Sequence, residues 1–98
     1  MKLIEKQKKF AYDFALLLVF AFERGYKITF PPEHTNHIKN SLHYIGLAKD
    51  INLFADGEYL TKTEDYEQLG DYWETLGNTW GGRFSDGNHF SIEHRGVK

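Results

Sequence analysis

The sequence predicts an α+β protein in which an N-terminal helix and a second helix pack on a small antiparallel sheet. Two segments carry apolar residues at the three- and four-residue spacing of a helix. The runs between and after them are short, rich in β-branched and aromatic residues, and bounded by Gly, Pro, Asp or Asn, which is typical of strands. An Asp-Gly pair separates two of these runs and is a strong signal for a hairpin.

The first helix is predicted over about residues 3–24. Phe10, Phe14 and Leu17 recur at helical spacing, and Gly25 follows at a position where a left-handed residue commonly ends a helix. Most of the remaining residues in its second half are also apolar, so we expect neighbouring elements to cover this helix on more than one side.

Three strands are predicted after this helix. The first covers residues 26–30 and ends at a Pro-Pro pair, because proline cannot donate to a β ladder. The second covers residues 47–54, and the third covers residues 58–60 after the Asp-Gly turn. Residues 33–41, between the first two strands, are polar and are expected to form a loop.

A second helix is predicted over about residues 64–76, where an apolar stripe again has helical spacing and Gly77 follows the end. The stripe consists of Tyr66, Leu69, Tyr72, Trp73 and Leu76. The chain from Thr79 to Val97 is expected to hold loops, a turn and a final strand around residues 90–92.

Length and composition favour one small domain over residues 1–98. A domain of this size has a modest core, and the 16% of aromatic residues offset that because each ring buries a large area. The chain has no cysteine, which excludes disulfides and cysteine-based zinc sites. Any transition-metal site must therefore use His, Asp or Glu, and five His are available.

The charge pattern argues against nucleic-acid and membrane functions. The net charge is −2 and no strongly basic patch lies outside the N-terminus, so nucleic acid is not an expected partner. Lysines near the N-terminus precede an apolar stretch over residues 14–22, which superficially resembles a signal peptide. Asp13 interrupts that pattern, and the stretch is too short to span a membrane. We therefore expect a buried helix, no signal peptide and no membrane span.

Two clusters carry residues suited to metal chemistry: "SLHYIGLAKD" over residues 41–50 and "WGGRFSDGNHF" over residues 80–90. A catalytic zinc ion typically takes three protein ligands, and two neutral His with one Asp satisfy this requirement. A further carboxylate can then accept the proton of a bound water, and the Gly and Asn between Asp86 and His89 allow a tight turn that would place one. By spacing alone, the same residues could equally be ordinary exposed or structural polar groups.

The order of the motifs carries a resemblance to a known family. Ser-x-His, Gly-x-Ala-x-Asp, Trp-Gly-Gly and Asp-x-x-His-Phe follow one another as in the zinc D-alanyl-D-alanine carboxypeptidase and L-alanyl-D-glutamate endopeptidase family, of VanY type. The chain is similar above all to short bacteriophage endolysins of this family. The resemblance extends from about residue 40 to the C-terminus and is weaker before it. It implies a Hedgehog-like DD-peptidase fold and a Zn²⁺ cofactor.

The resemblance also implies roles for individual residues. It makes His43, Asp50 and His89 the zinc ligands. It places Asp86 at the position of the general acid and base.

Three more residues are implied in substrate binding. Ser41 falls two residues before the first ligand, where it orients the site or touches substrate, and Trp80 belongs to the Trp-Gly-Gly element near the cleft. Alternatively, Trp80 is a packing anchor and not a platform for the substrate. The family's Arg-bearing segment is reduced here to residues 31–40, which contain no Arg, so Lys39 and Arg83 are the nearest charged candidates.

The same shortened segment holds His34 and His37. They are either exposed loop residues or replacements for the missing Arg in the cleft.

The expected function is zinc-dependent hydrolysis of a peptide bond in peptidoglycan stem peptides. An endolysin of this kind is expected to be a monomer that stays in the host cytoplasm without a signal peptide and acts on the cell wall after release. The alternative is a non-catalytic or repurposed zinc-binding member that binds wall fragments or a host protein.

Overall fold

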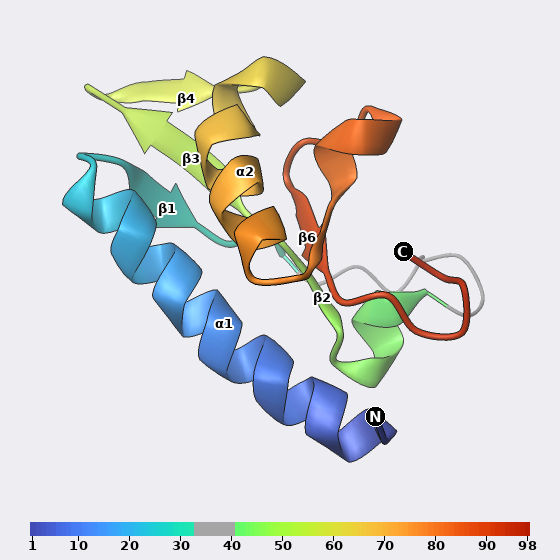
Figure 1. Ribbon diagram of the computed structural model, residues 1–98. Helices are drawn as coiled ribbons and strands as arrows, with labels where there is room; N and C mark the ends of the chain where they lie inside the picture. The colour runs from blue at the N-terminus through green and yellow to red at the C-terminus, as the bar shows by residue number, and fades with distance from the viewer. Residues whose placement is uncertain (33–40) are drawn as a thin grey trace.

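The computed structural model describes residues 1–32 and 41–98 and confirms the α+β class (Figure 1). The helices and strands are α1 (Leu3–Glu23), β1 (Lys27–Thr29), β2 (Ala48–Asp50), β3 (Asn52–Ala55), β4 (Glu58–Leu60), α2 (Glu67–Thr75), β5 (Thr79–Trp80) and β6 (His89–Ser91). Short 3₁₀ helices span Leu42–Ile45 (η1), Thr63–Tyr66 (η2) and Gly81–Phe84 (η3). In the described part of the chain, no helix is long and apolar enough to cross a membrane.

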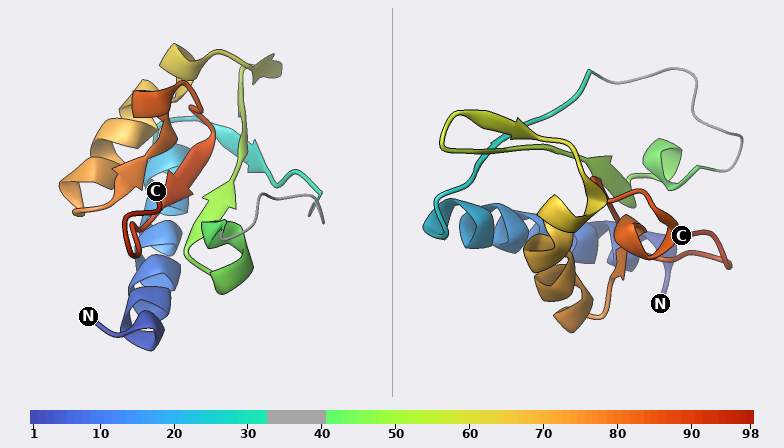
Figure 2. Two further views of the ribbon diagram at one scale, coloured as in Figure 1. Left: turned by 90° about the vertical axis from the view of Figure 1, so that its right-hand side faces the viewer. Right: turned by 90° about the horizontal axis from the view of Figure 1, so that it is seen from above.

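The strands form two three-stranded antiparallel sheets and not the single sheet that the sequence predicts. The orders are β1-β3-β4 and β2-β6-β5. The strand predicted over residues 47–54 is divided at Ile51 into β2 and β3, which belong to different sheets. Ile51 is fully buried, and its N–H donates to the carbonyl of Asn88 just before β6. The views in Figure 2 show the β3–β4 hairpin extending away from β6.

The core lies between α1, α2 and the sheets. Phe10 and Phe14 stack on each other on α1, and both meet the edge of Trp73 from α2 at centroid distances of 5.7 and 6.3 Å. The Trp73 indole is fully buried, and its N–H donates to the carbonyls of Thr79 and Ser91. This one side chain thereby joins α2 to both β5 and β6 and holds the β2-β6-β5 sheet against the helix.

The outer face of α1 corrects one expectation from the sequence. Tyr12, Val19 and Phe22 are 69%, 54% and 49% exposed, so the described residues leave this face of the helix open. Figure 1 shows α1 along one edge of the molecule, with the other elements on its inner side. The apolar surface of α1 is larger than the area that two small sheets and one further helix can bury.

Candidate metal centre

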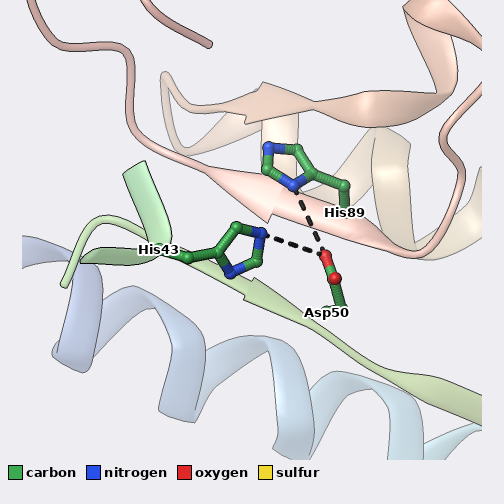
Figure 3. A group of neighbouring side chains, drawn as sticks. All are labelled: His43, Asp50 and His89. Atoms are coloured by element: carbon green, nitrogen blue, oxygen red, sulfur yellow. Dashed lines mark ion pairs between the residues drawn. The ribbon is translucent and has the colours of Figure 1, made fainter. Parts of the chain in front are cut away.

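Three side chains that are far apart in the sequence converge at one end of the β2–β6 pair. His43 comes from η1, Asp50 ends β2 and His89 begins β6 (Figure 3). Asp50 and His89 are direct partners in the antiparallel register. One ligand atom from each of the three residues lies within 4.8 Å of the other two. Strand pairing therefore places two of the groups, and the η1 turn adds the third.

Two distances within this group are close to the ligand spacing of a tetrahedral metal site. His43 Nε2 lies 3.5 Å and His89 Nδ1 lies 3.4 Å from Asp50 Oδ1. These separations are longer than a typical N–H···O hydrogen bond. They are close to the spacing of about 3.3 Å between two ligands of a tetrahedral zinc ion with bonds of about 2.0–2.1 Å. Both rings thus present a nitrogen to one oxygen at the spacing that a shared ion requires.

The polar contacts of His89 single out one of its ring nitrogens. The side chain is buried, and its Nε2 atom has no hydrogen-bond partner within the described residues. The Nδ1 atom faces Asp50, as Figure 3 shows. Since a metal binds the unprotonated nitrogen of a neutral imidazole, this arrangement favours Nδ1 as the donor and a proton on Nε2.

His43 is positioned by the turn that carries it. Ser41 caps η1, because its hydroxyl accepts a hydrogen bond of 3.2 Å from the His43 N–H. Gly46 ends η1 in the left-handed region at φ 70°, and the Gln7 side chain from α1 donates to the Ile45 carbonyl at 2.8 Å. Ser41 therefore orients His43 through the backbone, while contact of Ser41 with a substrate stays a prediction.

The loop before His89 can close only because Gly81 has no side chain. A Cβ atom at Gly81 would lie 2.2 Å from the Asp86 carbonyl oxygen and 2.7 Å from His89 Cβ. The two ends of this loop are joined by a hydrogen bond of 2.9 Å from the Asp86 N–H to the Gly81 carbonyl. The second cluster of the sequence therefore folds into a compact turn against β6.

Trp80 is a packing anchor, and contact of Trp80 with a substrate stays a prediction. Its side chain is only 2% exposed, and its N–H donates to the Gly87 carbonyl at 2.7 Å. A Cβ atom at Gly70 or at Gly82 would come within 2.1 or 2.2 Å of the indole. The ring thus fills a slot between two glycines.

Asp86 lies beside the converging group without being one of its three members. Its carbonyl accepts a hydrogen bond from the His89 N–H, so the turn between the two residues is tight as predicted. The side chain reaches solvent, but the surrounding protein raises the pKa of the Asp86 carboxyl, and the negative charge of Asp50 adds to the rise. The charges of His89 and His43 lower that pKa. Asp86 is thus electrostatically coupled to all three residues.

Arg83 is held by α2. Its guanidinium donates to Glu74 at 2.7 and 3.0 Å and to Asp71 at 3.3 Å, and it lies 5.0 Å from the Trp80 ring centroid. The hydrogen bond from Arg83 lowers the pKa of the Glu74 carboxyl. These contacts occupy the guanidinium, and its role toward a substrate stays a prediction.

The remaining candidates cannot be placed. His34, His37 and Lys39 lie outside the described residues, as does the loop predicted around them. Their roles stay predictions.

The sequence interpretation missed two residues that support the site. Gln7 braces η1 from a helix predicted only as core, and nothing in its spacing distinguishes it from other exposed helix residues. Gly70 receives the Trp80 ring. A glycine inside a predicted helix is a usable signal here, because its cost in helix propensity often marks a close approach.

Comparison with known proteins adds one match. A family model described as D-alanyl-D-alanine carboxypeptidase matches residues 34–92, which is more than half of the chain and includes all three converging residues. No curated protein matches the chain.

Proposed function

Because the chain belongs to the D-alanyl-D-alanine carboxypeptidase family, whose members are zinc peptidases acting on peptidoglycan, we propose that it hydrolyses a stem-peptide bond in a zinc-dependent reaction. One observation carries the proposal most directly: His43, Asp50 and His89 converge with two nitrogens 3.4–3.5 Å from one oxygen. Asp86 beside them supplies a carboxylate for proton transfer.

The donor set suits a catalytic zinc ion. His43 Nε2, Asp50 Oδ1 and His89 Nδ1 would hold it, and three protein ligands leave the fourth tetrahedral position for water or substrate. The two neutral imidazoles and one carboxylate leave the site with a net positive charge. When bound, the ion polarises the scissile carbonyl and makes water a nucleophile at neutral pH.

Residues of the chain then transfer the proton and hold the metal ligands in position. Asp86 accepts a proton from the attacking water and gives it to the departing amine. Ser41 and Gly81 keep the two histidines in place through the η1 turn and the compact loop before β6.

Within this family we assign the chain to the endolysin type that phages use to open the host wall. The support is the order of its motifs. We propose that residues 1–98 act as one domain and as a monomer.

A second candidate function is a zinc-stabilised member that binds wall fragments without cutting them. Arg83 favours it, because this arginine, a candidate for substrate binding, is already paired with Glu74 and Asp71. The shortened segment over residues 31–40 contributes no Arg of its own.

Incubation of the purified protein with purified cell walls distinguishes the two candidates. The proposal expects new amino groups and defined stem-peptide fragments in the mass spectrum, and expects a chelator to abolish them. Zinc binding together with wall binding, but without new fragments, would support the second candidate.

A further inference from the structure

A groove of about 920 Å³ lies where the start of α1, the η1 turn and the C-terminal segment meet. Figure 1 shows these three segments together at one end of the molecule. The cap and three residues of η1 line the groove: Ser41, Leu42, Tyr44 and Ile45. None of the three converging metal-site residues belongs to this lining, so the groove is distinct from the candidate metal centre.

Basic side chains gather in this groove. They are Lys2, Lys6, His94 and Arg95. Lys6 ties α1 to the C-terminal segment, because its Nζ atom donates to the Glu93 carbonyl at 3.0 Å and lies 3.2 Å from His94 Nδ1. Two lysines and one arginine thus bring positive charge to one end of a chain whose net charge is −2. Such a local potential attracts a negatively charged partner.

The turn that carries Arg95 indicates that this charge has a role. Two backbone hydrogen bonds of 3.0 Å join His94 to Val97 across the turn, and φ is 50° at Arg95 and 80° at Gly96. The Glu93 carboxylate fixes the turn by accepting from the Gly96 N–H at 2.7 Å. A two-residue turn with positive φ at both positions favours Asn, Asp or Gly at the first. An arginine held there is strained, and strain at a residue that lines a groove points to function.

Large apolar side chains line the same groove and are exposed to solvent. They are Met1, Leu3, Tyr44 and Val97. A small soluble anion would use the cations and leave these apolar side chains in water. An apolar protein partner would cover them but would leave the cations without counter-charges. The surface of an anionic bilayer satisfies both, because apolar side chains enter the interface while Lys and Arg meet the lipid phosphates.

We infer that this groove docks the protein on a membrane surface that carries anionic phospholipid. Lys2, Lys6 and Arg95 contact the lipid phosphates, and the exposed apolar side chains enter the interface beside them. Docking on the surface differs from spanning the membrane, for which no helix in the described part of the chain is long and apolar enough. The inference does not depend on the proposed peptidase activity.

Co-sedimentation with lipid vesicles tests the docking. The purified protein is mixed with vesicles of phosphatidylglycerol and phosphatidylcholine, or of phosphatidylcholine alone. We expect a partition coefficient roughly tenfold or more higher for the anionic vesicles, and a decrease with added salt. The double variant Lys2→Ala/Arg95→Ala should bind the anionic vesicles roughly 25-fold more weakly, about fivefold for each charge removed. Leu3→Gln should also weaken this binding, because it removes part of the apolar contact.

Lys27→Ala/Lys62→Ala is the matched control. It removes the same charge from two exposed sites outside the lining, and the partition coefficient should change by less than about threefold. Within the described residues, the side chains of Lys2 and Arg95 make no hydrogen bond or ion pair, so both double variants should keep the wild-type melting temperature.

Three results would overturn the inference. The first is absence of binding to the anionic vesicles, or equal binding to both kinds of vesicle. The second is an equal loss of binding in the two double variants, which would show that only net charge matters. The third is full displacement from the vesicles by millimolar inorganic phosphate at constant ionic strength, which would show that the groove holds a free anion and not a lipid surface.

Discussion

Asp50 and His89 face each other across the β2–β6 pair, with Asp50 Oδ1 3.4 Å from His89 Nδ1. The backbone ladder therefore sets the separation of these two groups before any metal binds. A site built on paired strands holds its geometry better than one built on loops. His43 is the exception, because its place depends on the η1 turn and the Ser41 cap.

Replacing a ligand should remove the metal. We expect His89→Ala and His43→Ala to lose stoichiometric zinc, because two remaining donors hold the ion too weakly. Metal content after gel filtration measures this. His94→Ala is the matched control, since His94 lies outside the converging group and should leave the content unchanged. Full zinc retention in both ligand variants would show that the site is wrongly assigned.

Removing the metal should lower the melting temperature of the wild-type protein. A ligand that binds only the folded state stabilises it, and in a domain of this size each 1 kcal/mol is worth about 4–8 °C. Scanning calorimetry with and without a chelator measures the shift. The His89→Ala protein should not respond to the chelator. A wild-type melting curve that stays the same after verified metal removal would contradict this prediction.

Asp86→Asn should keep the metal and lose activity. The amide cannot accept a proton, and positioned acid–base groups contribute roughly 10²–10⁴-fold to the rate. Zinc content and the rate of stem-peptide hydrolysis are measured on the same sample. Asp56→Asn is the control, because Asp56 sits in a turn at φ 51° that Asn also tolerates. If Asp86→Asn loses zinc while Asp50→Asn retains it, the ligand and the base have been exchanged.

Gly70→Ala should destabilise the fold although alanine favours helices. Its Cβ atom would lie 2.1 Å from the Trp80 ring, which cannot move without breaking its hydrogen bond to Gly87. Overpacking of this kind costs about 1–3 kcal/mol, which urea unfolding can measure. Glu67→Ala on the exposed side of α2 should change the stability by less than about 1 kcal/mol. Equal stability of the Gly70→Ala protein and the wild type would refute the packing argument.

Arg83→Ala should raise the pKa of Glu74 toward its ordinary value, because Arg83 lowers it in the wild type. A carboxyl with a lowered folded-state pKa stabilises the fold above its unfolded pKa. That contribution is lost as the pH falls through the folded-state pKa. The variant should therefore lose its small stability difference from the wild type in acid. An NMR titration of Glu74 measures the shift, and an unchanged Glu74 would show that the ion pair does not form in solution.

The elements with strong local signals could be predicted from the sequence. The first helix was expected over residues 3–24 and spans Leu3–Glu23, and the short strand over residues 58–60 has the expected bounds. The change of sheet at Ile51 could not be predicted, because an apolar run does not reveal which strand it pairs with. The 3₁₀ helices were also missed, since four residues are too few to show a helical period.

The candidate site was predicted from the order of the motifs and not from spacing. His43, Asp50 and His89 come together only through the β2–β6 register and the η1 turn, and the sequence shows neither directly. Trp80 was placed among the substrate contacts because it belongs to the Trp-Gly-Gly element of the resemblance, with a packing role as the alternative. The structure shows that Gly70 and Gly82 make room for its ring, while Gly81 allows the close approach of Asp86 and His89.

The passage of one uninterrupted segment through both sheets has a consequence for local opening. β2 and β3 are separated by Ile51 alone, so no loop can absorb a displacement of one sheet relative to the other. A fluctuation that pulls Asp50 away from His89 must strain the β1-β3-β4 ladder as well. The two sheets therefore form one cooperative unit, and their amide hydrogens should exchange with similar protection. Separation of Asp50 from His89 should therefore occur together with the opening of both sheets.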